Sequence, residues 1–269
     1  MIYELDGKDD LFSFLINSHL GFTEKVHTRF CKSVLGVNAS CSTFAIWGEL
    51  GRLPVKLSIF KHILVYYHRL LVSEEDNLLT NAFKESTYLK SEGVFGWLST
   101  IEVLLKSLGI QKGIAKISRM KPGAFKRFIN KLISSRFEQY WRNTILSPDG
   151  SSNKGGNKLR SYSLYKTRFH VEPYLQMQDR IARRTLAKFR CSDHTLEIEV
   201  GRHKGIPEKD RICRRCNLNC IENEEHFLLT CNAYEELRDR LLLLFRKLVP
   251  NFGEKRSPLS LKLLSNYVE

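Results

Sequence analysis

Long apolar runs are missing from this 269-residue sequence, and glycine and proline are sparse. No run approaches the about 20 apolar residues that a membrane-spanning helix needs, because Lys61, His62, His68 and Arg69 interrupt the most apolar stretch. With 16 glycines and 7 prolines, the composition excludes a collagen-like chain. The first ten residues are acidic and lack an apolar signal core. We therefore expect an intracellular protein of the cytoplasm or nucleus that does not bind a membrane.

Cysteines are too few and too unevenly spaced for a disulfide framework. The chain has seven, an odd number, which favours a reducing compartment and either buried thiols or a metal site. We expect Cys31, Cys41 and Cys191 to be ordinary core or surface thiols.

Positive charge is concentrated in one part of the chain. The formal net charge is +14, yet residues 1–100 and 217–269 each have a net charge of −1. Residues 101–216 contain 26 Lys/Arg against 10 Asp/Glu, a net charge of +16. A confined surplus predicts a binding face for a polyanion, RNA or DNA, whereas single lysines and arginines are commonly solvated helix surface.

Helical spacing of apolar residues dominates the chain and predicts a mainly α fold. The expected helices are 24–35, 44–50, 55–72, 78–89, 97–108, a long one from Pro122 through Trp141, 159–169, one opening at Pro173 and containing 180–190, and 233–249. The alternating residues 195–200 (TLEIEV) predict one short strand.

A polar, glycine-rich stretch marks the expected domain boundary. Residues 147–158 (SPDGSSNKGGNK) contain no apolar side chain and are predicted to be a flexible linker. We therefore expect a helical region at 1–146, a basic helical and metal-binding domain at 159–249, and a tail at 250–269.

Basic and aromatic residues interleave on both sides of the linker. The helix from Pro122 is predicted to have an aromatic side and a basic side. Beyond the linker, cations would contact phosphates and tyrosines could stack on unpaired bases. The candidate nucleic-acid contacts are Arg160, Tyr162, Tyr165, Lys166, Arg168, Arg180, Arg183, Arg184, Lys188, Arg190, Arg211, Arg214 and Arg215.

The spacing Cys-x2-Cys-x9-His-x4-Cys is the strongest chemical signal. Cys213, Cys216, His226 and Cys231 would supply three thiolates and one imidazole, a closed tetrahedral shell typical of structural Zn²⁺. No ligand position is left open for water, so hydrolytic zinc chemistry is not expected. Cys220 is a fifth candidate, which we interpret as a spare because it follows Cys216 so closely. The alternative is a group of buried thiols beside a helix histidine.

Several motifs together resemble one protein family. They are KLRSYSLYK (158–166), EPYL (172–175), residues 191–207, RICRRC (211–216) and EEHFLLTCNAY (224–234). The sequence resembles the C-terminal region of the reverse-transcriptase polyprotein of non-LTR (LINE-type, jockey-like) retrotransposons, including its zinc-binding domain. Upstream pieces at 30–40, 48–54 and 66–71 resemble the segment after the polymerase domain. The resemblance implies RNA or DNA binding beside a polymerase, with the same four zinc ligands; Asn232 departs from the proline often found after the last cysteine.

Compared with that family, this chain lacks the catalytic carboxylates. A polymerase needs paired aspartates for two Mg²⁺ ions, and the only adjacent pair, Asp9 and Asp10, has no strand pattern around it. The nuclease of some related elements uses Pro-Asp and Glu-x-Lys, but Pro148-Asp149 has no Glu-x-Lys to join it. Asp193, Glu197 and Glu199 are interpreted as a solvated strand edge. We therefore expect no enzyme activity from this chain alone.

Three hypotheses remain open at this point. The chain is a zinc-containing nucleic-acid-binding fragment of a retroelement protein, a zinc-stabilised protein-interaction module from a domesticated retroelement, or an enzyme part that works only when joined to a polymerase. The four leucines 241–244 exceed one amphipathic stripe and motivate the second hypothesis.

Overall fold

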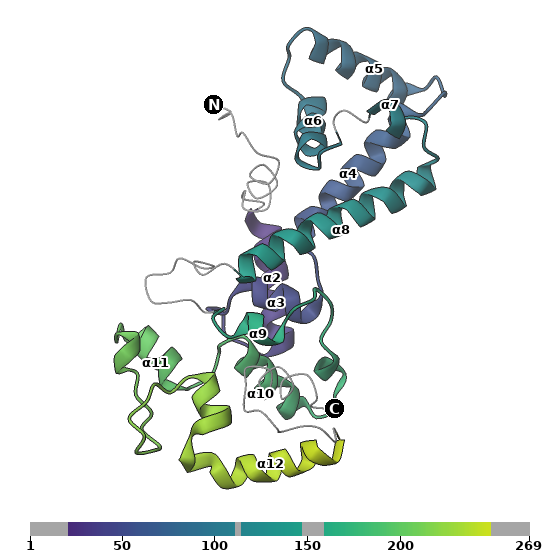
Figure 1. Ribbon diagram of the computed structural model, residues 1–269. Coiled ribbons are helices and arrows are strands. Elements are labelled where there is room, and N and C mark those ends of the chain that lie inside the picture. The colour runs from purple at the N-terminus through teal and green to yellow at the C-terminus, as the bar shows by residue number, and fades with distance from the viewer. Residues whose placement is uncertain (1–20, 111–113, 147–158, 249–269) are drawn as a thin grey trace. The chain divides into compact units, whose positions relative to one another are not determined.

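The computed structural model describes residues 21–110, 114–146 and 159–248, with the backbone alone for 114–115, 241–242 and 244–248. Helices dominate these residues, which contain no strand and only two isolated antiparallel bridges, so the expected mainly α fold is confirmed. No helix within them is long and apolar enough to cross a bilayer. The elements, labelled in Figure 1, are α2 (Gly21–Leu35), α3 (Thr43–Leu50), α4 (Val55–Leu71), α5 (Leu78–Ser91), α6 (Trp97–Ser107), α7 (Ile114–Ile117), α8 (Pro122–Leu146), α9 (Tyr162–Tyr165), η2 (Pro173–Gln176), α10 (Arg180–Arg190), α11 (Glu197–His203), η3 (Glu208–Asp210), η4 (His226–Thr230), η5 (Asn232–Tyr234) and α12 (Glu235–Leu248).

The described residues form two compact units that interleave along the chain. One contains residues 21–27, 53–110 and 114–140, and the other contains 28–52, 141–146 and 159–248. This division differs from the expected domains, because residues 28–52 belong with the C-terminal part. The expected linker 147–158 and tail lie outside the described residues, so those boundaries stay a prediction.

In the first unit, α4, α5 and α6 pack around a cluster of aromatic rings. The ring centres of Tyr67, Phe83 and Trp97 lie 6.0–6.5 Å apart in edge-to-face contacts. On the other side of α4, His68 stacks on Phe125 of α8 at 4.1 Å, and its Nε2 lies 3.1 Å from the Ile117 carbonyl. These contacts bring α4 and α8 side by side, as Figure 1 shows.

Helix α8 has the two sides that its sequence predicts. Phe125 and Ile129 are buried, whereas Lys126, Arg127 and Lys131 are exposed. The apolar positions recur every four residues and therefore share one face of the helix.

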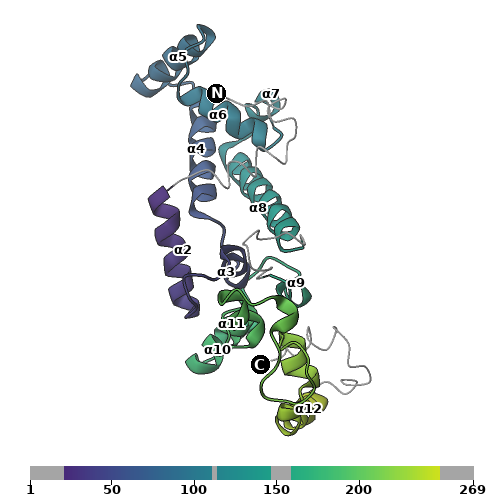
Figure 2. The same cartoon turned by 90° about the vertical axis from the view of Figure 1, so that its left-hand side faces the viewer.

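The second unit is centred on a buried carboxylate, that of Glu49 in α3. Arg190 of α10 donates to both its oxygens, from Nε to Oε2 at 2.8 Å and from Nη2 to Oε1 at 3.0 Å. The hydroxyls of Tyr162 and Tyr174 donate to the same oxygens at 2.9 and 2.7 Å. Glu49 thus joins α3, α9, η2 and α10, of which α3, α9 and α10 lie close together in both views (Figures 1 and 2).

Gly48 is required by this close packing. A Cβ at that position would lie 2.5 Å from the Tyr162 hydroxyl and 2.6 Å from the Trp141 ring. Trp141 itself is fully buried and donates from Nε1 to the Phe44 carbonyl at 2.8 Å. An alanine at 48 would force these large side chains apart.

The strand expected at 195–200 is wrong, since residues 197–203 form α11. Two backbone N–H groups at the start of the helix, of Glu197 and Ile198, donate to the side chain and carbonyl of Glu222 at 2.7 and 3.0 Å. Glu197 and Glu199 also lie in the first turn, where the helix dipole favours negative charge. The helix therefore depends on a partner 25 residues away, which alternation in the sequence does not reveal.

The helix expected at 159–169 is also wrong, because only the single turn α9 forms. Tyr162 is drawn to Glu49, and the ammonium of Lys166 turns inward to the Glu172 carboxylate and the His170 carbonyl. These buried hydrogen bonds replace the ones that a continuing helix would make.

We predict that Arg190→Met strongly destabilises the protein. The substitution leaves the Glu49 charge buried without its main partner, which costs about 3–5 kcal/mol in free energy of unfolding. Burial favours a raised pKa for Glu49, but Arg190 and its other partners outweigh it and lower the pKa. The pair therefore contributes stability above the ordinary carboxyl pKa, and this contribution is lost as the pH falls toward the lowered value.

Chemical denaturation provides the measurement, with Arg180→Met as the control on the exposed start of the same helix. The control should change stability by less than about 0.5 kcal/mol. Equal stability of the two variants would contradict a structural role for the Glu49–Arg190 pair.

Candidate metal centre

A short hairpin positions the first two cysteines. Ile212 and Ile221 form an antiparallel bridge, flanked by hydrogen bonds of 2.9 Å from Cys213 N to the Cys220 carbonyl and from Glu222 N to the Arg211 carbonyl. The loop closed by this hairpin contains Cys216 and turns through Asn219, which has a left-handed φ of 50°. Asparagine tolerates that conformation better than most residues.

A π-helical turn positions the histidine and the last cysteine. In η4 the Cys231 N–H donates to the His226 carbonyl at 2.8 Å, an i to i+5 hydrogen bond. The turn starts where the Asn223 side chain accepts from the His226 N–H at 2.7 Å. The wide π-helical turn brings His226 and Cys231, which four residues separate in the sequence, to one site. The turn therefore explains the spacing between them.

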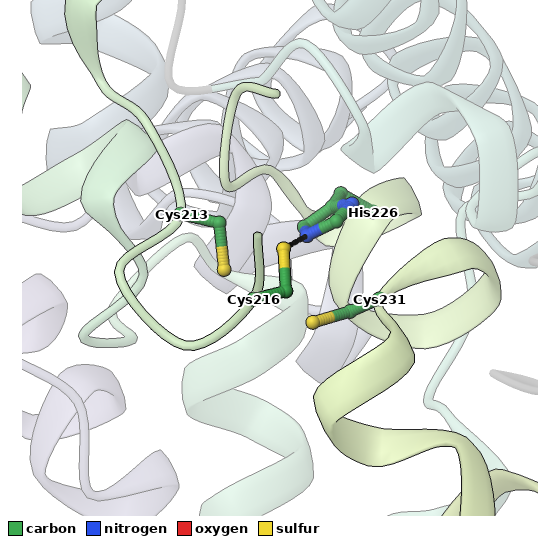
Figure 3. Close-up of side chains that lie close together, drawn as sticks. All are labelled: Cys213, Cys216, His226 and Cys231. Carbon is green, nitrogen blue, oxygen red and sulfur yellow. Dashed lines mark hydrogen bonds between the residues drawn. The ribbon is translucent and has the colours of Figure 1, made fainter. Parts of the chain in front are cut away.

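The four predicted ligands meet at one point (Figure 3). The sulfur and nitrogen atoms of Cys213, Cys216, His226 and Cys231 all lie within 4.8 Å of one another. Cys216 Sγ is 3.4 Å from His226 Nε2. Thiolates bonded at about 2.3 Å to a tetrahedral ion lie about 3.8 Å apart, so the four atoms are near enough to one another to close around such an ion. The cysteines are not joined by disulfides, and the predicted cluster could hold a metal ion.

The imidazole of His226 is oriented by its second nitrogen. Nε2 faces Cys216, while Nδ1 lies 3.0 Å from Thr230 Oγ1 on the same turn. When Nδ1–H donates to Thr230, Nε2 carries the lone pair that can bind a metal. Cys220 Sγ lies 3.2 Å from Nδ1, beside the ring and outside the group of four.

The protonation of the cluster couples metal binding to pH. Burial raises the pKa of Cys213 to about 12, whereas the Leu218 backbone lowers the pKa of Cys216. Burial also lowers the pKa of His226, which keeps the imidazole in the neutral form that binds metals. A metal ion must displace the thiol protons, so its affinity decreases at lower pH.

Two buried arginines near the cluster donate hydrogen bonds to backbone carbonyls, one of them in the cluster itself. Arg238 of α12 is buried and donates from Nη2 to the Cys231 carbonyl at 2.9 Å. Arg211 is also buried and donates to the carbonyls of Ile206 and Ile198 at 2.9 and 3.0 Å. Arg238, Thr230 and Asn223 carry no signal in the sequence, because their roles depend on the positions of carbonyl groups and of the imidazole ring.

Four of the predicted phosphate-binding cations are instead internal. Arg190 and Lys166 are buried against Glu49 and Glu172, and Arg211 is buried among backbone carbonyls. The Arg160 side chain is 21% exposed and pairs with Glu199 at 2.5 Å and with Glu224 at 2.6 Å. Their assignment as surface contacts is corrected here, because each charge is satisfied inside the protein.

The two predicted stacking tyrosines are internal as well. Tyr162 is fully buried and bound to Glu49, and Tyr165 is 3% exposed with its hydroxyl on the Arg190 carbonyl. Neither ring presents a face to solvent, so neither can stack on a nucleobase in this fold.

The remaining predicted contacts lie at the surface. Arg183 is half-buried, with Nη1 donating to the Met177 carbonyl at 2.9 Å. Exposed side chains are those of Arg168, Arg180, Arg184, Lys188, Arg214 and Arg215.

The acidic residues near 193–199 differ from the expected solvated edge. Glu199 is 2% exposed and pairs with Arg160 and Arg202, and Asp193 accepts from Asn38. The Asp9–Asp10 and Pro148–Asp149 pairs lie outside the described residues.

Comparisons of the chain with protein-family models, with curated proteins and with solved structures find no match.

We predict that the cluster binds one metal ion per chain. The variants Cys213→Ala and Cys231→Ala should each lose this metal ion. Each substitution removes a buried ligand of the group of four. Cys220→Ala is the matched control and should keep full metal content, because its thiol lies outside the group. Elemental analysis of the purified variants is the measurement, and metal loss in Cys220→Ala alone would overturn the ligand assignment.

We also predict that Thr230→Val weakens metal affinity about tenfold while the stoichiometry is kept. Valine preserves the side-chain shape but cannot accept the hydrogen bond from His226 Nδ1, and such outer contacts affect affinity about 10–100-fold. Competition against a chromophoric chelator measures the change. An affinity equal to the wild type would show that Thr230 does not orient the imidazole.

Proposed function

We propose that this chain is a zinc-containing, single-strand nucleic-acid-binding fragment of a non-LTR retrotransposon reverse transcriptase. Cys213, Cys216, His226 and Cys231 would hold Zn²⁺, a metal favoured by three thiolates and one imidazole. The site would act structurally, since all four positions are protein ligands. The binding free energy of such an ion is also folding free energy, so zinc would stabilise the hairpin and the π-turn together.

The observation that carries the binding proposal is the exposed cationic stripe on α10. Arg180, Arg184 and Lys188 recur every four residues, are all exposed, and make no ion pair with any described residue. Four helical residues rise about 6 Å, so these cations form a row that can follow the phosphates of an extended strand. Arg168 and Arg215 are exposed in the same unit.

A second cationic surface lies on α8, in the other unit. Lys126, Arg127 and Lys131 of α8 and the preceding Lys121 are exposed. This surface supports the same polyanionic partner. The proposal assigns no catalytic step to this chain, and we expect no primer extension from it alone; the polymerase portion of the same element would supply catalysis.

We predict that the affinity for a short single-stranded oligonucleotide falls steeply with salt. Each neutralised phosphate of a single strand contributes about −0.7 to the slope of log K against log salt. The triple variant Arg180→Gln, Arg184→Gln and Lys188→Gln should therefore flatten the slope by about 2. Fluorescence anisotropy titrations in RNA and DNA, between about 50 and 200 mM salt, measure both slopes.

The matched control removes three exposed cations from the N-terminal part of the chain, by Lys25→Gln, Arg29→Gln and Arg69→Gln. It should leave the slope unchanged. A wild-type affinity that does not vary with salt would exclude the proposed phosphate contacts.

A protein-interaction module is the second candidate, and exposed apolar side chains favour it. Phe22, Val26, Phe30 and Val34 of α2 recur every four residues and are 48–82% exposed. On α12, Leu237 is 61% exposed. Retention of a protein partner after nuclease treatment, with loss of that partner in Phe30→Ser, would support this second function.

A further inference from the structure

A cavity of about 690 Å³ lies in the second unit, between α10 and the hairpin that holds the metal ligands. Its volume falls in the range of small-ligand sites. It is lined by residues of α10, of the following segment 193–197, and of the metal-binding lobe. The metal ligands themselves do not line it, so the cavity is a separate feature of the same lobe.

Aromatic rings form the apolar part of the cavity. The ring centre of Phe227 lies 6.0 Å from that of Phe189 and 5.0 Å from that of Tyr234. All three side chains are half-buried and therefore keep some surface toward solvent. A flat aromatic ligand can stack on such rings, and every nucleobase has a flat face of this kind.

Three exposed cations line the same cavity: Lys188, Arg214 and Arg215. Lys188 is also the last member of the α10 stripe, so the stripe leads to the cavity. The Arg214 side chain is 71% exposed and lies 3.1 Å from Glu197 through Nε, which leaves its terminal nitrogens toward other partners.

The acidic groups of the lining are already engaged by the protein. Asp193 accepts from the backbone and side chain of Asn38 at 2.9 and 2.6 Å, and Glu222 accepts from the Glu197 N–H at 2.7 Å. Glu197 pairs with Arg214. Their charges are therefore partly balanced, and the lining offers both donors and acceptors of hydrogen bonds.

His194 adds an unsatisfied polar atom to this lining. Its side chain is 9% exposed, and its Nε2 lies 2.9 Å from Glu224 Oε1. Its buried Nδ1 has no hydrogen-bond partner. The contact with Glu224 holds the imidazole in place, so His194 forms a fixed part of the cavity wall.

We propose that this cavity is a subsite for one unpaired nucleobase of a single strand. The base would stack on Phe189 and Tyr234. The neighbouring phosphates would contact Lys188, Arg214 and Arg215. The inference rests on the proposed nucleic-acid binding and adds to it a site that takes a base rather than phosphate alone.

The test uses the full chain, loaded with zinc, and two single-stranded probes of equal length and charge. One strand consists only of abasic residues, and the other carries a single central 2-aminopurine. The abasic strand reports phosphate binding alone, whereas the base-containing strand also reports the cavity. We expect the wild type to bind the second strand about five- to tenfold more tightly, as one stacked base contributes, and to quench 2-aminopurine fluorescence.

Two variants remove the subsite by different routes. Phe189→Leu keeps an apolar side chain and removes the aromatic face, and Thr185→Met extends a non-aromatic side chain into the cavity from an exposed position on α10. Both should bind the two strands equally and lose the quenching, with unchanged zinc content as the check of folding. Phe95→Leu, at an exposed phenylalanine outside the cavity, is the control and should behave as the wild type.

The outcomes separate this inference from the proposed function. If the wild type binds both strands with equal affinity and without quenching, the subsite is refuted and phosphate binding stands. If it binds neither strand, both proposals fail. If both Phe189→Leu and Thr185→Met still bind the base-containing strand more tightly than the abasic strand, base recognition lies elsewhere and the subsite is overturned.

Discussion

The cost of burying a charge governs how the second unit is built. An unpaired carboxylate in the protein interior is too costly to persist, so Glu49 must collect partners, and it does so from α9, η2 and α10. Arg190 lies over the rings of Tyr165 and Tyr174 at 5.0 and 5.5 Å while it binds the carboxylate. The position of α10, and with it the direction of its exposed cations, follows from this buried pair.

The same constraint separates the basic residues into two groups. Arginines and lysines that find a buried acid or a row of carbonyls turn inward and hold the fold together, as Arg160 and Arg211 do. Those without such a partner remain at the surface, where their charge is available to a polyanion. The net charge of residues 101–216 is for this reason a poor measure of how many cations a polyanion could reach. The candidate interface is a narrower stripe along α10 that leads to an aromatic cavity.

The metal-ligand cluster depends on local backbone geometry as well as on residue type. The hairpin closes Cys213 and Cys216 into one loop, and the i to i+5 hydrogen bond of η4 brings His226 and Cys231 together. Spacing alone was sufficient to predict the four donors, because a short loop and a single turn leave few other arrangements. Most helices were also predictable, since α4, α5, α6 and α8 repeat their apolar residues with helical period. In contrast, α11 was missed because Glu222 caps its start, and α9 was overextended because Tyr162 and Lys166 are held by distant acids.

The sequence by itself determined the helical class of the fold and which four residues form the cluster that could hold a metal ion, because both depend on periodicity or spacing over a few residues. Only the tertiary structure decided which cations face solvent and which tyrosines are buried. Arg190 and Glu49 are separated by 141 residues along the chain and are 2.8 Å apart in the fold. A pairing of that kind has no local pattern, since it arises when two helices pack and each buried charge must find its counterpart.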